Sequence, residues 1–569
     1  MKVLGVNGWP DRSHHAAACL LDDGVLVAFA EEERFTRKKN APNTAPVQAT
    51  VFCLEAAGIG LDDIDVVAFG WDLPRLYRDR GLLWTVSDAD FLDMLVPRRV
   101  FPRRRDPELA FIPHHLAHGA SAYYLADADS AAVLVMDGQG EAESTSLAHG
   151  RGGKLTILES LPPSWSLGYL YEAVCEYVGL RWNDAGKLMG LAGHGRRHEL
   201  PVLTVDGTEV RFPGVPWDLR SSVAPDEHGE MLNFWRRRLP EVLSAPGNYR
   251  ISAGSDPCGV RQDPFDFRDL ATSVQWALEQ AVMALATRAI ELTGEQSLLL
   301  AGGVSLNASA NGTLLDHPSI TDLFVQPIAH DSGVSLGAAA YVAATGGDRI
   351  HPMAGSVALG PEFSPDQVRH ALGSVGIVYS RVDEPSRAAA DLIAGGKVIG
   401  WFQGRAEVGP RALGHRSILS MPNDVGLRDH INRDVKEREM WRPFAPSMLR
   451  DAAARYLGRD ASFPYMIVAT DVPADIQPAI AGVVHADGTT RPQTVSPEVD
   501  PLYAALLAAV GEHTGHPVVL NTSFNGRDEP IVGSPTDAIE AFRAMPLDAL
   551  VIGPYVAARE QQFWPEGSA

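Results

Sequence analysis

Short apolar runs alternate with amphipathic stretches along roughly the first 345 residues, a pattern typical of an α/β protein. One apolar strand is followed by two more that flank the turn Asp22-Asp23-Gly24, and Asp-Gly between apolar runs predicts a hairpin. A similar unit recurs where an apolar strand enters the glycine-bearing turn 137–141, so we predict a weak internal repeat. Two such turns facing each other could hold a nucleotide phosphate chain through backbone N–H groups. The predicted strands cover residues 3–8, 16–21, 25–30 and 132–136.

A long helix is predicted for residues 268–292, where apolar residues recur at three- and four-residue steps. Gly294 suits the end of this helix. The next apolar run, 298–301, predicts a strand that enters the paired glycines Gly302-Gly303, with Asn307 and Asn311 following. A strand, paired glycines and amides together suit a nucleotide-binding turn, although paired glycines alone are a weak signal.

Two domains are expected, because the chain has 569 residues and a single core stops growing near ~250–300. Residues 346–363 are rich in Gly and Pro and predict a linker between an α/β domain at 1–350 and a mixed α/β domain at 364–569. The second domain begins with a helix for which Ser364 is the N-cap, followed by Pro365 and, three residues on, Gln367. Its clearest predicted strands are residues 398–402 and 518–520.

The composition of the chain disfavours some classes of binding partner. The net charge of −22 disfavours a nucleic-acid partner; it suits a cationic substrate, although solubility is the more ordinary explanation. No apolar run approaches the ~20 residues that span a bilayer, and the N-terminus lacks an apolar signal core, so we expect a cytoplasmic protein without a membrane partner. The four cysteines form no CxxC pair and are predicted to be reduced core thiols. They are Cys19, Cys53, Cys175 and Cys258.

The run His114-His115-Leu116-Ala117-His118 is a candidate metal site. If it is helical, His114 and His118 lie one turn apart on the same face and can bind one divalent ion. Asp137, after a buried strand, or Asp331, in the loop 330–333, could supply oxygen ligands. The alternative is a pair of ordinary histidines. The chain has no HExxH, so a metalloprotease would lack its general base.

A pocket for a compact anion is predicted in the last third of the chain. Residues 404–414, GRAEVGPRALG, place two arginines and three glycines directly after an apolar strand. Arginine binds phosphate with a planar fork, and glycine lets phosphate approach the backbone. Lys436, Arg442 and the segment 521–525 beyond the strand 518–520 would complete the pocket, although each segment alone is also explained as a cap, turn or solvated loop.

The basic run 97–105 has no catalytic role in this interpretation. We expect a solvated loop. The alternative is that it neutralises a nucleotide or a neighbouring subunit, as in a homodimer.

Together these residues resemble the antibiotic O-carbamoyltransferase family, which includes nodulation and cephamycin carbamoyltransferases. The likeness covers nearly the whole chain. It is carried, in order, by NGWPDRSHHAA, AEEERFTRKKNAPNTAPVQA, FIPHHLAHGASAYY, VMDGQGE, WSLGYLYE, GKLMGLAGHG, AGGVSLNASANG, HDSGVSLGAAA, GRAEVGPRALGHRS, VKEREMWRPFAPS, RPQTV and VLNTSFN. The resemblance implies an actin-like, sugar-kinase-like N-terminal domain, as in the tRNA threonylcarbamoyl transferases, fused to a C-terminal YrdC-like carbamoyl-phosphate domain.

The resemblance also implies ATP-dependent O-carbamoyl transfer with two active sites. In the C-terminal domain, carbamoyl phosphate and ATP, as its magnesium complex, would give carbamoyl adenylate and pyrophosphate. In the N-terminal domain, the carbamoyl group would move to a hydroxyl of a natural product. His14 matches the general base, although the neighbouring His15 stands where a relative has an acid.

The resemblance further implies three sets of binding residues. The metal, expected to be iron(II), would be held by His114, His118, Asp137 and Asp331. Carbamoyl adenylate would contact Lys39, Gly138, Gly168, Gly303 and Asn307. Carbamoyl phosphate and ATP would contact Arg411, Lys436, Arg442, Arg491, Asn521 and Ser523.

The acceptor stays open, because residues 196–262 depart most from the family pattern. An aminoglycoside, a macrolide sugar or an ansamycin core are all compatible with the sequence. A tRNA-modifying carbamoyl transferase would share the histidine motif, but the net charge of −22 and the fused C-terminal domain disfavour it. A non-catalytic nucleotide-dependent switch or chaperone of actin-like fold would not need the pocket built from 404–414 and 521–525.

Overall fold

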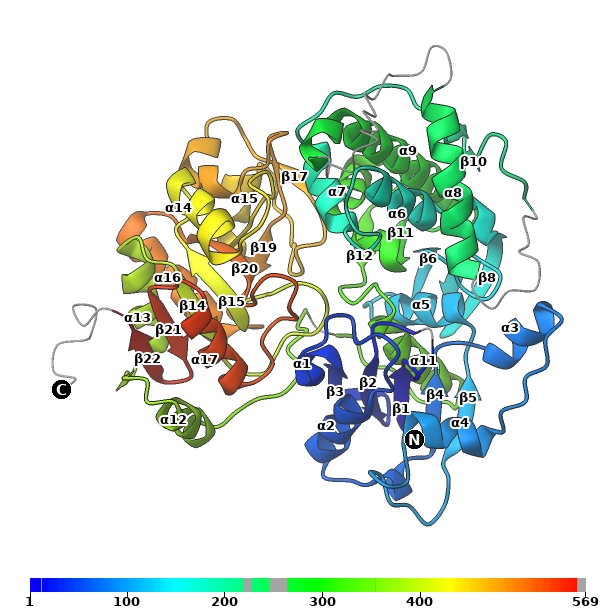
Figure 1. Ribbon diagram of the computed structural model, residues 1–569, viewed down its shortest axis with the longest axis horizontal. Helices are drawn as coiled ribbons and strands as arrows, with labels where there is room; N and C mark the ends of the chain where they lie inside the picture. The colour runs from blue at the N-terminus through cyan, green and yellow to red at the C-terminus, as the bar shows by residue number, and fades with distance from the viewer. Residues whose placement is uncertain (12, 218–226, 245–262, 354, 560–569) are drawn as a thin grey trace, which may run out of the picture. The chain divides into compact units, whose positions relative to one another are not determined.

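The computed structural model describes residues 1–11, 13–217, 227–244, 263–353 and 355–559 (Figure 1). The chain forms two compact units. The first consists of residues 1–7, 20–26 and 60–352, and the second of residues 8–19, 27–59 and 353–569. Two segments from the N-terminal part of the sequence therefore belong to the same unit as the C-terminal third, and His14 and Lys39 lie in them.

Two five-stranded sheets share one topology, with strand orders β3-β2-β1-β4-β5 and β8-β7-β6-β11-β12. In each, the central strand pairs in parallel with the strand that returns from a crossover, as β1 with β4 and β6 with β11, and a further parallel strand follows. This duplication confirms the predicted internal repeat and the actin-like, sugar-kinase-like fold class. The strands are β1 Lys2–Asn7, β2 Ala17–Asp22, β3 Val25–Glu31, β4 Val66–Phe69, β5 Glu108–Phe111, β6 Ser130–Met136, β7 Thr145–Arg151, β8 Lys154–Leu161, β11 Ser297–Ala301 and β12 Asp322–Val325.

The predicted elements of this region are confirmed to within two residues at their ends. β6 is buried along nearly its whole length, as expected of a strand covered on both faces. Helix α9 runs from Arg268 to Thr293 and ends at Gly294, which has φ 72°. The other helices and strands of the first unit are α3 Leu73–Asp79, α4 Asp88–Leu95, α5 His114–Tyr123, α6 Leu167–Tyr177, α7 Ala185–Ala192, α8 Glu227–Ser244, α10 Ala308–Thr313, α11 Ser332–Thr345, β9 Thr204–Asp206 and β10 Glu209–Arg211.

Helices α5 and α11 cross at very short range. A Cβ atom added to Gly337 of α11 would lie only 1.7 Å from the carbonyl oxygen of Ala117 in α5. The sequence of α11, SGVSLGAAAYVAAT, has small residues through its buried part and so permits this approach. The crossing brings Asp331, which precedes α11, toward the histidines of α5.

Replacing Gly337 by alanine is expected to destabilise the first unit. Alanine favours a helix over glycine by ~1 kcal/mol, but its Cβ would lie 1.7 Å from a backbone carbonyl oxygen that cannot move away like a flexible side chain, so overpacking of ~3 kcal/mol or more prevails. Thermal melting followed by circular dichroism measures the change. Gly186→Ala in α7 is the matched control, because a Cβ there meets nothing within 4 Å. Equal melting temperatures for both variants would contradict the packing argument.

The second unit is built on an eight-stranded mixed sheet with order β13-β22-β21-β14-β15-β20-β16-β19, which confirms the predicted mixed α/β class. Helices α13 and α16 supply apolar side chains to one core with strands of this sheet. The sheet strands are β13 Ser380–Arg381, β14 Ile399–Phe402, β15 Arg416–Ser420, β16 Ala445–Leu449, β19 Gln493–Val495, β20 Val518–Ser523, β21 Ala549–Ile552 and β22 Tyr555–Ala558. A separate pair is β17 Thr470–Asp471 and β18 Thr489–Thr490.

Helix α12 begins at the predicted capping box, in which Ser364 and Gln367 bond each other's backbone N–H groups. One prediction is wrong: Asn521, Thr522 and Ser523 do not follow their strand but form its end, because they pair with β15. A strand continues through polar residues as long as its backbone is paired with a neighbouring strand. The helices of this unit are α1 Glu33–Thr36, α2 Val47–Ala57, α12 Pro365–Ser374, α13 Pro385–Ala394, α14 Val425–His430, α15 Ala453–Leu457, α16 Pro501–Thr514 and α17 Pro535–Ala544.

Buried contacts tie the N-terminal residues of this unit to the segment 404–414. The Arg34 guanidinium lies 2.7 Å from the Glu31 carboxylate and donates to the Gly409 carbonyl at 2.8 Å. Arg37 donates to the carbonyls of Pro530 and Ile531. The AEEERFTRKKN motif therefore supports the loops of the C-terminal sheet.

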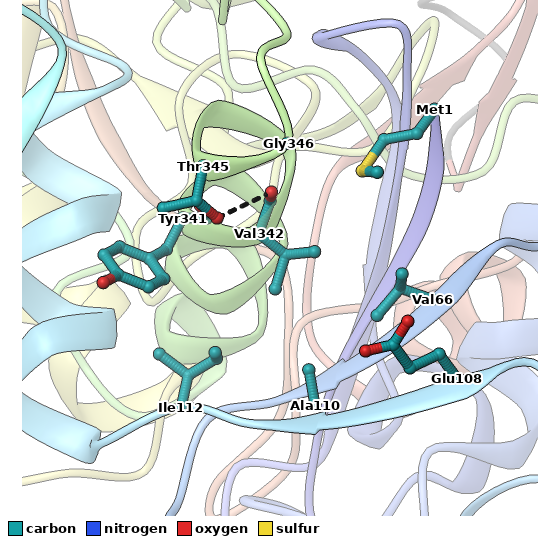
Figure 2. A pocket seen from close by; sticks show the side chains of 9 residues that line it. All are labelled: Met1, Val66, Glu108, Ala110, Ile112, Tyr341, Val342, Thr345 and Gly346. Carbon is teal, nitrogen blue, oxygen red and sulfur yellow. Dashed lines mark hydrogen bonds between the residues drawn. The ribbon is translucent and has the colours of Figure 1, made fainter.

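No helix in the described ranges is both long and apolar enough to cross a membrane. Cys19, Cys53 and Cys175 are buried thiols, as predicted, and Cys258 lies outside the described residues. A largely apolar hollow of about 370 Å³ lies beside β5 and the C-terminal end of α11 (Figure 2). None of the predicted site residues lines it.

Candidate metal centre and anion pocket

The structure brings the four predicted metal ligands together within the first unit. The Nε2 atoms of His114 and His118, one turn apart on α5, lie 3.1 Å from each other. Asp137 Oδ2 lies 3.3 Å from His114 Nε2 and 3.6 Å from His118 Nε2. Asp331 Oδ1 lies 3.9 and 3.8 Å from the same two atoms. All four ligand atoms fall within 4.8 Å of one another.

Contacts around these side chains orient their lone pairs toward one point. His114 Nδ1 lies 3.1 Å from the Gly70 carbonyl oxygen, which can only accept, so Nδ1 carries the proton and Nε2 presents its lone pair. Asp137 Oδ1 accepts from the Gly303 N–H at 2.9 Å, leaving Oδ2 to face the histidines. Two imidazole nitrogens and two carboxylate oxygens at this spacing fit a divalent transition metal.

The electrostatics of the cluster also favour a bound cation. Both histidine side chains are completely buried. Burial lowers the pKa of His114, but its bond to Asp137 and the charge of Asp331 prevail and raise that pKa to about 9. Burial raises the pKa of Asp137, yet the histidines hold it well below its usual range. Two buried carboxylates thus require positive charge between them, from a proton or a metal ion.

Glu141 holds the start of helix α5, which carries the two histidine ligand candidates, and the sequence did not point to it. Helix α5 follows Pro113 and has no side-chain cap of its own. The buried Glu141 carboxylate instead accepts from the His114 N–H at 3.0 and 3.1 Å and from the Asp72 N–H at 2.7 Å. Its motif, VMDGQGE, was visible, but the capping contact joins residues 27 apart in the chain.

Two of the predicted adenylate glycines lie against each other beside Asp137. A Cβ on Gly168 would lie 2.9 Å from the Cα of Gly138, so their backbones touch. Ser166 caps α6 and donates to the Asp137 carbonyl at 3.2 Å. The predicted nucleotide turns therefore surround one metal-ligand candidate.

Asn307 is held by a reciprocal amide pair with Gln275, with both N–O distances 2.9 Å. Its side-chain oxygen also caps α10 by accepting from the Ala310 N–H. Gln275 further accepts from the Tyr171 hydroxyl at 2.7 Å. Gln275 and Tyr171 were not singled out from the sequence, because only the fold places them beside Asn307.

His14 and Lys39 lie in the second unit. The Nδ1 atoms of His14 and His15 lie 2.8 Å apart, and His15 has φ 56° with its N–H donating to the Asn40 carbonyl. Lys39 is exposed, and its charge contributes to lowering the pKa of Lys436 after burial and the charges of two arginines. Lys39 thus neighbours the C-terminal cations.

Five cations gather in the second unit, where the sequence predicted an anion pocket. Burial, followed by the charge of Arg442, lowers the pKa of Arg411 to about 10. Arg491 has a pKa well below its usual range, first from burial and then from its three neighbouring arginines. Arg438, within the motif VKEREMWRPFAPS, also belongs to this set, although it was not among the predicted site residues. The five are Arg411, Lys436, Arg438, Arg442 and Arg491.

Such a cluster is costly without an anion, because each of these buried or partly buried cations disfavours the charge of the others. The Arg411 Nε atom is buried and has no hydrogen-bond partner within the described part of the chain. A polyanionic ligand would satisfy that atom and neutralise the cluster.

Three predicted pocket residues bond to the protein itself. Lys436 Nζ donates to the Ser523 carbonyl at 2.8 Å and to the backbone and side-chain oxygens of Asn525 at 2.7 Å, which uses all three of its protons. The Asn521 side-chain N–H₂ donates to the Ala412 carbonyl at 3.2 Å. Ser523 Oγ donates to Asn525 Oδ1 at 2.6 Å. Lys436, Asn521 and Ser523 thus shape the loops around Arg411.

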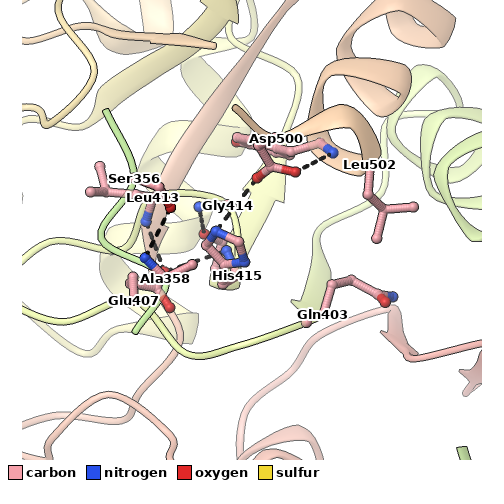
Figure 3. A network of polar contacts seen from close by, with 12 residues as sticks. Ser356, Ala358, Gln403, Glu407, Leu413, Gly414, His415, Asp500 and Leu502 are labelled. Atoms are coloured by element: carbon pink, nitrogen blue, oxygen red, sulfur yellow. Dashed lines mark hydrogen bonds and ion pairs between the residues drawn. The ribbon is translucent and has the colours of Figure 1, made fainter. Parts of the chain in front are cut away.

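Glu407 closes the loop that carries Arg411 (Figure 3). Its Oε1 atom accepts from the backbone N–H groups of Leu413, His415 and Arg416 at 2.8, 3.4 and 3.1 Å. Glu407 is only 2% exposed, so this buried charge depends on those donors. Sequence composition suggested phosphate chemistry for 404–414 but not this internal anchor.

Glu407→Gln is expected to lower the free energy of unfolding by ~1–3 kcal/mol, because an amide accepts more weakly than a carboxylate and brings a surplus donor. Denaturant unfolding of the whole chain measures the change. The exposed Glu540→Gln on α17 removes the same charge without such a network and is expected to leave stability unchanged. Indistinguishable unfolding midpoints for the two variants would show that Glu407 is not an anchor.

Models of two protein-family regions match the chain. The carbamoyltransferase N-terminus matches residues 2–78 and 84–340, and the carbamoyltransferase C-terminus matches residues 390–559. The chain belongs to the carbamoyltransferase family. This carbamoyltransferase is therefore a transferase enzyme, and the family resemblance drawn from its motifs is confirmed.

Relatives match this carbamoyltransferase over most of its length. Nodulation protein NolNO of Sinorhizobium fredii is 36% identical over 95% of this chain and 78% of its own. Nodulation protein NolO of Bradyrhizobium diazoefficiens is 34% identical over 80% of each chain. An uncharacterized protein of Synechocystis is 34% identical over 98% of this chain and 97% of its own.

Solved structures show more distant likeness. The HypF structure from T. kodakarensis is 15% identical over 60% of this chain and 47% of its own, with a TM-score of 0.35. The family assignment of this carbamoyltransferase rests on the family models and the relatives.

Proposed function

We propose that this carbamoyltransferase makes carbamoyl adenylate from carbamoyl phosphate and ATP, and then transfers the carbamoyl group to a hydroxyl of a small natural product in antibiotic biosynthesis. The observation that carries the proposal is the group of five cations that includes Arg411, of which Lys436 is buried and the four arginines are partly buried. A carbamoyl donor that is itself small and doubly anionic, beside a polyphosphate, accounts for so much positive charge in one place.

In the first half-reaction, the phosphoryl group of carbamoyl phosphate passes to water and the carbamate oxygen displaces pyrophosphate from the α-phosphorus of ATP. The products are carbamoyl adenylate, phosphate and pyrophosphate. Arg411, Arg442 and Arg491 bind the phosphate oxygens and offset the charge that accumulates on them. Glu407, Asn521 and Lys436 hold the loops that present these arginines.

In the second half-reaction, the acceptor oxygen attacks the carbamoyl carbon and AMP leaves. His14 takes the hydroxyl proton. Backbone N–H groups at Gly138 and Gly168 contact the adenylate, and the backbone of Gly303 lies against it. His114, His118, Asp137 and Asp331 would hold a divalent ion, iron(II) in this proposal, whose Lewis acidity polarises the carbamoyl group or its phosphate.

The test is to incubate the protein with ATP, Mg²⁺ and carbamoyl phosphate and to quantify pyrophosphate and carbamoyl adenylate. We expect both, and omission of either substrate should abolish them. Release of ADP without pyrophosphate, or no release of either, would refute the proposal and favour a nucleotide-dependent switch. A mass-spectrometric screen of hydroxylated natural products for a carbamoyl mass gain then identifies the acceptor.

A further inference from the structure

The Arg438 guanidinium is fixed by the protein on one face and one edge, and it takes no part in the proposed half-reactions. Its central carbon lies 4.3 Å from the centre of the Phe444 ring, and its Nε donates to the Asn432 side-chain oxygen at 2.6 Å. Its Nη2 reaches the Pro443 carbonyl only at 3.4 Å, and its Nη1 makes no hydrogen bond within the described ranges. The Nη1 end is therefore available to a ligand.

Asn432 is the residue that holds this arrangement, and its side chain is completely buried. Besides accepting from Arg438 Nε, its amide nitrogen donates to the carbonyls of Arg442 at 3.1 Å and Met440 at 3.4 Å. Its backbone carbonyl accepts from the Arg438 N–H at 2.9 Å. One buried amide thus fixes the guanidinium of Arg438 and the backbone of Arg442, two members of the five-cation group.

The backbone between these residues has an uncommon conformation. Asn432 lies in a π-helical turn, Ile431–Val435, that continues from α14. Glu437 then has φ 44°, in the left-handed region that residues other than glycine rarely occupy. Both features are frequent at functional sites, where surrounding contacts hold the strained backbone in place. Here the contacts are the two bonds from Asn432 to Arg438.

The surroundings of Arg438 are cationic. Burial, followed by the charge of Arg442, holds the pKa of Arg438 well below its usual range. Arg438 in turn contributes to lowering the pKa of Arg491, after burial and the charge of Arg411. An arginine fixed among other arginines is disfavoured until an anion binds, and phosphate oxygens match the N–H groups of a guanidinium.

We propose that Arg438 binds a phosphate oxygen of carbamoyl phosphate or ATP through Nη1, and that Asn432 is a positioning residue that holds Arg438 for this contact. This inference rests on the proposed function and adds two residues to its activation site. A guanidinium that is already fixed on one face and one edge loses little freedom when the anion binds. The affinity for the anion should therefore depend on Asn432 as well as on Arg438.

The experiment is calorimetric titration of the full chain with carbamoyl phosphate and, separately, with inorganic pyrophosphate, a probe for the outer phosphates of ATP. We expect Arg438→Met to weaken the binding of at least one anion about tenfold, because methionine can still pack on Phe444 but carries no charge. The anion that is affected identifies the substrate that Arg438 contacts. Arg433→Met, at a side chain that is 64% exposed, is the matched control and should bind both anions as the wild type does.

Asn432→Ala should weaken binding of the same anion about fivefold in the wild-type background and by a smaller factor in Arg438→Met, because part of its effect passes through Arg438. The same factor in both backgrounds would overturn the positioning role. Unchanged affinity of Arg438→Met for both anions, or no binding of either anion by the wild type, would overturn the phosphate contact. The titration needs no turnover, so a wild type that binds these anions but releases no pyrophosphate would refute the proposed function and leave the binding role of Arg438 intact.

Discussion

Arg411→Ala is expected to lower pyrophosphate release from ATP and carbamoyl phosphate by about two to four orders of magnitude. The side chain is partly buried beside other cations, and its buried Nε has no protein partner in the described chain, so a phosphate oxygen is the partner it can serve. Losing one member of a buried charged contact costs ~3–5 kcal/mol, which corresponds to that loss of rate. A coupled pyrophosphate assay at saturating ATP measures it.

Arg433→Ala is the matched control, because that arginine lies close to Lys436 in the sequence but its own side chain is 64% exposed. It should retain wild-type activity. A second readout needs no catalysis: inorganic pyrophosphate should raise the melting temperature of the wild type and of Arg433→Ala, and raise that of Arg411→Ala much less. Equal activity and equal stabilisation in both variants would remove the anion pocket from the account.

His118→Ala is expected to abolish tight metal binding. It removes one of two imidazole ligands from a cluster whose atoms all lie within 4.8 Å, and a water in its place binds more weakly. After anaerobic loading with Fe²⁺ and desalting, elemental analysis should find about one ion per wild-type chain and close to none in the variant. Pyrophosphate release should persist, because the cation cluster is a separate group of residues.

The exposed His351→Ala controls for the loss of any imidazole and should keep the full metal content. A wild-type metal content in His118→Ala, or no metal in the wild type, would show that these four side chains are not a metal centre.

Local patterns were enough to predict those elements whose defining residues lie close together in the sequence. The three- and four-residue period of α9 and its terminal Gly294, and the capping box of α12 at Ser364, are encoded within a few residues. The i, i+4 histidines were recognisable for the same reason, since one helical turn fixes their spacing. The order of the family motifs predicted Asp331 as a ligand, whereas residue spacing alone did not decide whether Asp137 or Asp331 supplies oxygen.

Contacts between distant segments could not be predicted from such patterns. Glu141 caps a helix that begins 27 residues earlier, and Arg34 reaches a carbonyl 375 residues away. Contacts between residues far apart in the sequence also place residues 27–59 in the second unit. Lys436 shows a related limit: its sequence context suggested a phosphate ligand, whereas its three protons bond to protein oxygens.

The two-site account is tested most directly by supplying preformed carbamoyl adenylate, with a carbamoyl-accepting natural product, to Arg411→Ala and His14→Ala. Arg411→Ala, which cannot make the adenylate, should transfer its carbamoyl group at close to the wild-type rate. His14→Ala should release pyrophosphate from ATP and carbamoyl phosphate normally but carbamoylate no acceptor. If both variants lose both half-reactions alike, activation and delivery are not separate, and the account is contradicted.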